Sequence, residues 1–269
     1  MSNSDCIIKK IAEDKYIMYS WFEAMYTRFD IVLIYNIEQD TSNIIEKIKN
    51  EIIRLELIAN RFLPESELFF LNENAGKQIK VSEELFYMID YCIRYNEYTY
   101  GYFDITVNSK PFVKDNIKSV KLFEDNSIQF LNENIRIDLN GYLKGYALDK
   151  IKNILTEENI TDALLNFGNS SIMALGNHPN GNGWKISPQN NMQEVLLYNE
   201  CYTTSGNEIS TRKHILNPLE GKYIEGEKTI SVITKKAADG EIFSTALFAA
   251  DNEIRECIIR QFSLSVYIL

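Results

Sequence analysis

Cysteine and histidine are scarce in this chain, and their scarcity excludes several kinds of site. The 269 residues include four cysteines and two histidines, and no Cys-x-x-Cys pair occurs. A structural zinc site needs four nitrogen or sulfur ligands at characteristic spacings, so this composition argues against one. We expect free thiols in a reducing compartment rather than disulfides, because the cysteines lie far apart: Cys6, Cys92, Cys201 and Cys257.

Long apolar runs, repeats and low-complexity tracts are also missing. The N-terminal residues MSNSDCIIKKIAEDKY contain no stretch long enough for a signal peptide or a membrane span. No hydrophobic region precedes Cys6, so lipoprotein processing is not expected, and we predict a cytoplasmic or at least anchorless protein. Only five prolines and 12 glycines occur, and no linker stands out. We therefore predict an N-terminal extension over residues 1–20 and a single domain over 21–269.

Positive charge is in short supply. The chain has 28 Lys and Arg residues against 38 Asp and Glu residues, which gives a net charge of -10. This balance argues against a nucleic acid or an anionic membrane as the partner. It also creates a requirement, because a chain this acidic needs a local Lys, Arg or metal ion to hold a phosphate compound.

Hydrophobic periodicity predicts a mixture of helices and strands. Apolar residues at helical spacing predict a helix over 41–61, and Ser82 is the expected N-cap of a second helix. Further helices are predicted over 142–155, 240–250 and 252–262. Strands are predicted over 30–35, 120–123, 127–130, 135–138, 164–167, 171–175, 184–187, 194–198, 229–234 and 263–269. Without strict alternation of strand and helix, the fold class is α+β with mixed, largely antiparallel sheets.

The segment from Asp138 to Asp149, DLNGYLKGYALD, is the most informative stretch. An Asn-Gly turn, Lys144 and a second glycine lead into an amphipathic helix. Glycines let a ligand approach the backbone closely, and a helix N-terminus presents free N–H groups to an anion. This segment is not a P-loop, because no Ser or Thr follows Lys144. An ordinary strand, turn and helix would explain the pattern equally well.

The same segment resembles the D-L-G-G-x-x-K-G-Y-A-x-D signature of the FAD:protein FMN transferase (ApbE) family. Other segments resemble that family in its sequence order: GYFDITV (101–107), ALLNFGNSSI (163–172), TSGN with HILNP (204–207 and 214–218) and STALFA (244–249). Weaker likenesses are AMYTRFDIVLI (24–34) and RFLPESELFFLN (61–72). The resemblance implies an ApbE-like architecture, related to the T-fold, with a cleft between two lobes.

The resemblance implies phosphoryl transfer. FAD would be cut at its pyrophosphate, the FMN half would pass to a Ser or Thr hydroxyl of an acceptor flavoprotein, and AMP would leave. His214 matches the family's histidine and is the expected general base, since imidazole titrates near neutrality. The positions that match FAD contacts are Asp138, Lys144, Asp104, Phe103, Tyr102, Ile215, Met25 and Phe62. Two other interpretations stay open, a pyrophosphatase that makes FMN and AMP, and a flavin-binding module without turnover.

The resemblance also implies a Mg²⁺ ion on the phosphates. Glu241 and Thr245 lie four residues apart, so a helix would place both oxygen donors on one face, as a hard cation requires. Gly141 would offer its main-chain carbonyl, and Ser244 is expected to contribute a main-chain oxygen. Without a metal, Glu241 would be a first-turn acid that is favourable to the helix dipole.

Several residues depart from the family's pattern. Glu241 stands where the family has Asp, and Asn217 replaces an Asp near His214. Asn140 replaces the first glycine of D-L-G-G, and Tyr26 departs from A-M-G-T. Asn169 replaces the second glycine of an N-x-G-G turn, which we expect to survive because Asn tolerates positive φ. After GYFDITV, the residues NSKPFVKDNIKSVKLF leave almost no room for the helical segment that the family has there.

Overall fold

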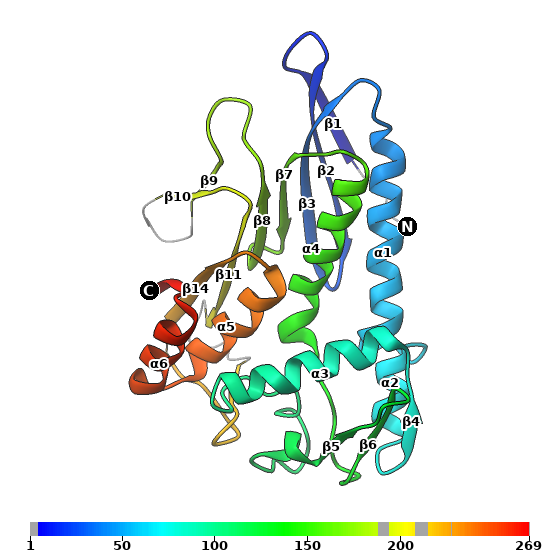
Figure 1. Ribbon diagram of the computed structural model, residues 1–269, viewed down its shortest axis with the longest axis vertical. Helices are drawn as coiled ribbons and strands as arrows, with labels where there is room; N and C mark the ends of the chain where they lie inside the picture. The colour runs from blue at the N-terminus through cyan, green and yellow to red at the C-terminus, as the bar shows by residue number, and fades with distance from the viewer. Residues whose placement is uncertain (1–4, 188–193, 208–214, 227, 269) are drawn as a thin grey trace. The chain divides into compact units, whose positions relative to one another are not determined.

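The alternating apolar residues of Thr27–Asn36 form strand β3 of an eight-stranded sheet in the computed structural model (Figure 1). The structure describes residues 5–187, 194–207, 215–226 and 228–268. Phe29, Ile31 and Leu33 are fully buried, whereas Asp30 and Val32 between them are half-buried. Side chains alternate across a strand, so one face of the sheet is covered at this strand and the other is partly open.

The main sheet has the strand order β1-β2-β3-β7-β8-β11-β14-β15. Pairing is antiparallel from β1 through to β11, and Phe29 lies opposite Phe167 with their ring centroids 4.4 Å apart. The other strands of this sheet are β1 (Asp5–Lys10), β2 (Lys15–Ala24), β7 (Asp162–Phe167), β8 (Ser171–Leu175), β11 (Glu200–Asn207), β14 (Lys228–Thr234) and β15 (Ser265–Ile268).

Smaller sheets hold the remaining strands. One has the order β4-β6-β5, and two others are the pairs β9–β10 and β12–β13. Their bounds are β4 (Gln78–Lys80), β5 (Val120–Leu122), β6 (Ser127–Phe130), β9 (Trp184–Ile186), β10 (Val195–Leu197), β12 (Leu216–Asn217) and β13 (Lys222–Tyr223). Together with the helices they confirm the predicted α+β class with antiparallel sheets.

The helices follow the predicted apolar stripes. They are α1 (Thr41–Ala59), α2 (Glu67–Glu73), α3 (Glu83–Tyr98), α4 (Asn140–Glu157), α5 (Ala237–Ala249) and α6 (Asn252–Phe262), with a short 3-10 helix η1 (Asn116–Ser119). The Ser82 hydroxyl accepts a hydrogen bond from the N–H of Leu85 at 3.2 Å, which confirms the predicted N-cap of α3. None of the helices in the described ranges combines the length and the apolar character needed to span a membrane.

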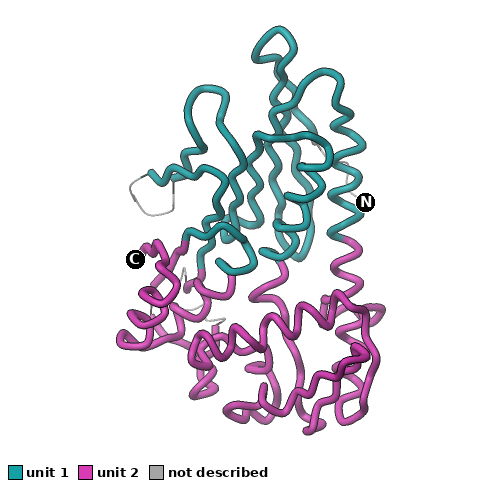
Figure 2. Tube along the Cα trace, viewed as in Figure 1, with its two compact units in different colours: residues 1–52, 144–204, 233–240 teal, residues 53–143, 205–232, 241–269 magenta. Residues whose placement is uncertain are grey.

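The chain divides into two compact units (Figure 2). Unit 1 comprises residues 1–52, 144–204 and 233–240, and unit 2 comprises residues 53–143, 205–232 and 241–269. Each unit is therefore assembled from segments that are distant in sequence. The predicted extension over residues 1–20 contains β1 and the first part of β2. The single domain over 21–269 stays a prediction.

Unit 1 contains the N-terminal strands, most of α1 and most of α4. Lys49 of α1 places its Nζ 5.0 Å from the centroid of the Phe22 ring of β2. Phe22 is buried on the same side of the sheet as Phe29, and the two rings meet edge to face at 5.5 Å. The covered face of the sheet therefore carries the core of this unit.

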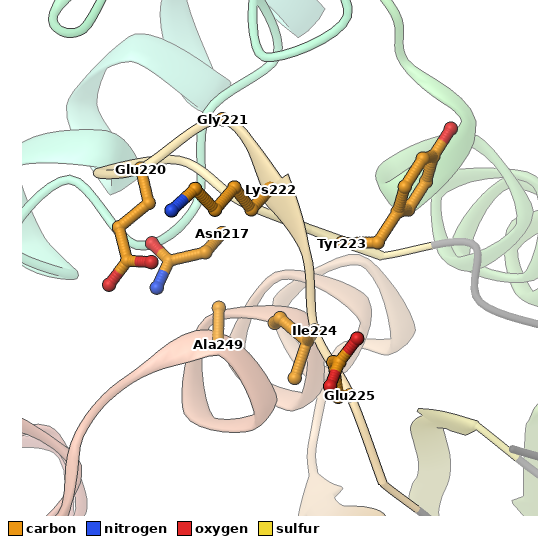
Figure 3. Close-up of a pocket in the computed structure, with 8 residues that line it drawn as sticks. All are labelled: Asn217, Glu220, Gly221, Lys222, Tyr223, Ile224, Glu225 and Ala249. Atoms are coloured by element: carbon orange, nitrogen blue, oxygen red, sulfur yellow. The ribbon is translucent and has the colours of Figure 1, made fainter.

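Unit 2 has a separate hydrophobic cluster formed by β14, α5 and α6. Its buried members are Ile230, Val232, Phe243, Leu247, Phe248 and Ile258. Beside this cluster, the β12–β13 hairpin lines an open hollow of about 690 Å³ (Figure 3). The hollow is lined by Asn217, Glu220, Gly221, Lys222, Tyr223, Ile224, Glu225 and Ala249, and none of the predicted site residues within the described ranges lines it.

Three local predictions are wrong. Residues 135–138 are not a strand, because side chains take the place of a neighbouring strand, as described below. Asn140 and Gly141 form the first turn of α4 rather than a turn before it. Helix α5 begins at Ala237 instead of near Gly240. Helix α2 and six strands were not predicted from the sequence: β1, β2, β4, β11, β12 and β13.

Candidate functional site

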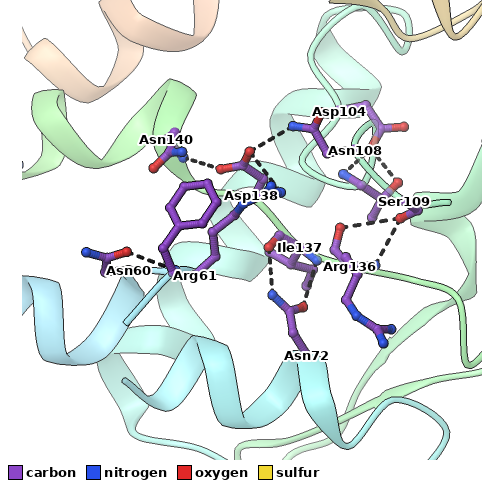
Figure 4. A network of polar contacts seen from close by, with 12 residues as sticks. Asn60, Arg61, Asn72, Asp104, Asn108, Ser109, Arg136, Ile137, Asp138 and Asn140 are labelled. Atoms are coloured by element: carbon purple, nitrogen blue, oxygen red, sulfur yellow. Dashed lines mark hydrogen bonds and ion pairs between the residues drawn. The ribbon is translucent and has the colours of Figure 1, made fainter. Parts of the chain in front are cut away.

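Asp138 gathers several segments of unit 2 at the start of α4 (Figure 4). One carboxylate oxygen, Oδ1, accepts a hydrogen bond from the N–H of Asn140 at 3.0 Å and so caps the helix. The other, Oδ2, accepts from the Asn108 amide at 2.8 Å and lies 3.2 Å from Nη1 of Arg61. Asn140, Arg61 and Asn108, which come from distant parts of the sequence, therefore meet at one carboxylate.

Side chains hold the extended segment that leads to Asp138. The Asn72 amide donates to the carbonyl of Ile137 at 2.9 Å and accepts from the N–H of the same residue at 2.8 Å. The Ser109 hydroxyl accepts from the N–H of Arg136 at 2.9 Å. The N–H of Asp138 donates to the carbonyl of Ile105 at 2.7 Å. Main-chain groups need partners, and these contacts supply them without a sheet, which explains the wrong strand prediction.

Arg61 and Asn108 are contacts of Asp138 that were not predicted from the sequence. Arg61 opens the family-like segment RFLPESELFFLN, and Asn108 directly follows GYFDITV. The guanidinium carbon of Arg61 also lies 4.5 Å from the centroid of the Phe62 ring, which is 54% exposed. The net charge of -10 pointed to a local cation, but nothing in the sequence distinguishes Arg61 from the other basic residues.

The GYFDITV segment places its three predicted residues differently. Tyr102 is buried and donates its hydroxyl to Oδ2 of Asp251 at 2.8 Å. Phe103 is buried as well. Asp104 accepts from the N–H and the hydroxyl of Thr106 at 2.6 and 2.7 Å, both through Oδ1. Burial raises the pKa of Asp104, although the Thr106 hydrogen bonds oppose this shift. A partly buried carboxyl with a raised pKa makes Asp104 a candidate functional residue.

Helix α5 contributes a cluster of oxygen donors to unit 2. The Ser205 hydroxyl lies 2.8 Å from the Ser244 hydroxyl and 3.1 Å from the Thr245 hydroxyl. A Cβ atom on Gly141 would lie 3.8 Å from Oγ1 of Thr245 and 3.6 Å from the Phe103 ring. Glu241, which lies one turn before Thr245, is 5% exposed. The structure thus brings Gly141, Ser244 and Thr245 together with Ser205, which belongs to β11.

The donors in this cluster suit a hard cation. Carboxylate, hydroxyl and carbonyl oxygens are the ligands that Mg²⁺ prefers, and a Mg²⁺ site often combines one or two carboxylates with substrate phosphates. Among the described residues, His, Cys, Asp and Glu side chains form no group of three or more that would hold a metal ion. The hydroxyl oxygens of Ser205, Ser244 and Thr245 are donors of the kind that Mg²⁺ accepts, and Glu241 lies one turn before Thr245 on α5.

Lys144 lies in unit 1, where its ammonium group donates a hydrogen bond to the Ser170 hydroxyl. Ser170 follows a turn in which Gly168 and Asn169 both have a φ of 59°, which confirms that Asn169 preserves the turn. A Cβ on Gly168 would lie 2.4 Å from Oγ1 of Thr27, directly after the Met25–Tyr26 turn of the β2–β3 hairpin. In unit 1, Lys144 therefore lies beside the turn at residues 166–169, and that turn packs against the β2–β3 turn at residues 24–27.

The remaining predicted residues lie around the HILNP segment. Ile215 is half-buried and packs against the hydrophobic cluster of unit 2. Asn217 accepts a hydrogen bond from the N–H of Leu219 at 2.9 Å and so stabilises the β12–β13 turn. His214 lies outside the described residues. Its role as a base stays a prediction.

Comparison with known proteins connects this arrangement to a family. A model described as the ApbE family matches residues 25–114 and 109–268. The FAD:protein FMN transferase of Chlamydia muridarum is 26% identical over 227 residues, which cover 72% of this chain and 71% of that protein. The FAD:protein FMN transferase of Escherichia coli (strain K12) is 21% identical over 271 residues, covering 83% and 76%.

Solved structures share the fold. The apo flavinyl transferase ApbE of Pseudomonas stutzeri superposes with a TM-score of 0.85 at 16% identity, covering 96% of this chain and 94% of that one. The flavin transferase ApbE from Vibrio cholerae superposes with a TM-score of 0.83 at 18% identity, covering 99% and 94%. At these identities the superpositions establish the shared fold.

Proposed function

The chain belongs to the ApbE family, and from this membership we propose that it transfers the FMN part of FAD to an acceptor protein. The oxygen of an acceptor Ser or Thr hydroxyl would form a bond to the phosphorus of the FMN half. The bond from that phosphorus to the AMP oxygen would break, and AMP would leave. The proton of the acceptor hydroxyl would pass to a base on this chain.

One observation carries the proposal. Gly141, at the start of α4, lies beside Thr245 of α5, and Thr245 bonds to Ser205 of β11. These three residues come from the DLNG, STALFA and TSGN segments, which are far apart in sequence. Their convergence in unit 2 produces a cluster of oxygen donors at a helix N-terminus, which is the arrangement that a metal-assisted phosphoryl transfer needs.

We assign each residue a role in this reaction. Glu241, Thr245 and the main-chain oxygens of Gly141 and Ser244 would hold Mg²⁺. The ion would neutralise charge on the pyrophosphate. Asp104, Asp138, Lys144 and the apolar residues Met25, Phe62, Tyr102, Phe103 and Ile215 would bind FAD. His214 would accept the proton of the acceptor hydroxyl.

The activity is tested by two products in one reaction. The protein is incubated with FAD, Mg²⁺ and a peptide that carries Ser or Thr, and AMP and covalent flavin on the peptide are measured. We expect equal amounts of both. AMP without peptide labelling, but with free FMN, would instead favour the pyrophosphatase. FAD binding without AMP would favour the binding module.

Metal dependence has its own test. EDTA should abolish AMP release, and added Mg²⁺ should restore it. Glu241→Gln keeps the shape of the side chain and removes its charge, so we expect at least a tenfold higher Mg²⁺ requirement, about the effect of losing one charge-assisted contact. The matched control is Asp239→Asn, two residues earlier on α5. If both variants respond to Mg²⁺ like the unmodified protein, Glu241 is not a ligand.

A further inference from the structure

Arg61 occupies a well-supported turn in unit 2, directly after α1. The side chain of Asn60 accepts a hydrogen bond from the N–H of Phe62 at 3.0 Å, and its carbonyl accepts from the hydroxyl of Ser66 at 2.6 Å. The N–H of Leu63 also donates to the carbonyl of Asn60 at 3.2 Å. These hydrogen bonds hold the backbone at Arg61 and Phe62 in place, so both side chains extend from a fixed main chain.

The Arg61 guanidinium is held on two sides. Its Nη1 lies 3.2 Å from Oδ2 of Asp138, and its Cζ lies 4.5 Å from the centroid of the Phe62 ring (Figure 4). The side chain of Asp138 is 11% exposed, and that of Arg61 is 24% exposed. A guanidinium carries five N–H donors in a planar fork, so Arg61 has donors beyond the one that faces Asp138. Its planar face and its charge are both oriented in advance of any ligand.

We propose that Arg61 binds a phosphate oxygen of the flavin nucleotide, with Asp138 and Phe62 holding its guanidinium in place. The proposal rests on the proposed function and adds a binding residue that the family-like motif positions do not include. A chain with a net charge of -10 needs a cation next to a pyrophosphate. Arg61 is a basic residue of unit 2 that contacts the DLNG segment, whereas Lys144 donates a hydrogen bond to Ser170 in unit 1.

The alternative is a purely structural role for Arg61. In that case the ion pair with Asp138 would only help to cap α4, and its loss would affect all ligands equally. A phosphate contact predicts a different result, because it depends on the phosphate groups of the ligand. Ligands that share the isoalloxazine ring and differ in phosphate therefore separate the two roles.

The experiment measures the dissociation constants of FAD, FMN and riboflavin by quenching of flavin fluorescence. We compare the unmodified protein with Arg61→Gln and Arg61→Lys. Arg61→Gln should weaken FAD and FMN binding by about 10- to 100-fold, the range for one hydrogen bond to a charged group. Riboflavin binding should change by less than about threefold, and Arg61→Lys should recover part of the loss, because lysine keeps the charge without the planar fork.

Arg94 provides a matched control in the same unit. It lies 3.0 Å from Asp90 and 5.5 Å from the centroid of the Tyr91 ring, so it repeats the ion pair and the stacked ring on α3. Arg94→Gln should leave all three affinities unchanged. Asp138→Asn is the second variant, because it releases Arg61 and keeps the cation, and it should weaken FAD binding less than Arg61→Gln does.

Three outcomes would overturn the proposal. An equal loss of affinity for riboflavin and FAD in Arg61→Gln would assign Arg61 a structural role. Unchanged affinities in that variant, with FAD bound by the unmodified protein, would remove Arg61 from the site and leave the proposed function intact. If the unmodified protein binds none of the three flavins, the proposed function fails together with this inference.

Discussion

The DLNGYLKGYALD segment has an aspartate at each end, and the two lie in different surroundings. Asp138 in unit 2 accepts from the N–H of Asn140 and faces Arg61 and Asn108. Asp149 in unit 1 accepts from the main-chain N–H groups of Ala237 at 2.9 Å and Ala238 at 3.0 Å. Each carboxylate caps a helix, but Asp138 caps the helix that contains the motif and Asp149 caps α5.

This difference separates two functions within one signature. The contacts of Asp149 join α4 to the start of α5 and belong to the packing of unit 1. The contacts of Asp138 bring together loops that carry an arginine, an amide and an exposed aromatic ring. Two aspartates of one motif therefore make different contacts, Asp149 with the start of α5 and Asp138 with Asn140, Asn108 and Arg61. Geometry distinguishes them, because their residue type is the same.

The two glycines of the motif offer the strongest test of this separation. A Cβ on Gly145 would lie 2.4 Å from the carbonyl oxygen of Ala237, and the main chain there cannot move aside cheaply. We expect Gly145→Ala to lower the free energy of unfolding by about 3 kcal/mol or more. A Cβ on Gly141 would make only ordinary van der Waals contacts, at 3.6 and 3.8 Å. Gly141→Ala should therefore change the free energy of unfolding by less than about 1 kcal/mol.

Urea unfolding of both variants measures this difference. If Gly141→Ala destabilises the protein as much as Gly145→Ala, the two ends of the motif do not differ in packing. FAD binding by the Gly141→Ala protein adds a second readout, because the metal contact proposed for Gly141 is made by its main-chain carbonyl, which alanine retains.

Asp149→Asn should have the next largest effect. An amide has one oxygen, so it satisfies only one of the N–H groups of Ala237 and Ala238 and turns its NH₂ group toward the other. A buried unsatisfied donor costs about 1–3 kcal/mol, and we expect a loss of this size in urea unfolding at pH 7. Asp138→Asn should affect stability less and FAD affinity more. The reverse order would refute the assignment of Asp149 as the structural cap.

Asp104→Asn should have the smallest effect on stability, and the effect should depend on pH. Burial raises the pKa of Asp104, so the folded protein retains this proton to a higher pH than the unfolded chain does. Stability therefore falls as the pH rises from the unfolded value of about 3.9 through the raised pKa. Asparagine does not titrate, and its single oxygen can keep both Thr106 hydrogen bonds, since both reach Oδ1.

We expect Asp104→Asn to be more stable than the unmodified protein by about 0.5 kcal/mol at pH 7, the scale of a mild substitution. The advantage should shrink as the pH is lowered to about 4, the usual Asp range. Thermal melts at several pH values measure it. A stability difference that stays constant over this range would show that Asp104 does not titrate differently in the folded state.

Much of the fold was predictable because local periodicity and capping act over a few residues. The buried stripe of α1, the Ser82 cap of α3 and the strands at Ser127–Phe130 and Ser171–Leu175 were confirmed. The strand predicted over 135–138 was wrong, because the hydrogen-bond partners of this segment, Asn72 and Ser109, come from distant parts of the chain. No local pattern distinguishes a strand from an extended segment held by side chains.

The sequence by itself determined the motif segments, the class of fold and the need for a cation near a phosphate. Composition and local spacing are sufficient for these, since they depend on neighbouring residues. Only the tertiary structure decided that Arg61 contacts Asp138, that Thr245 lies beside Gly141 and that Asp149 caps α5. Each of these contacts joins residues that are far apart in the sequence. These residues come close because the hydrophobic core of each unit is buried. The spacing of the contact residues in the sequence does not predict that proximity.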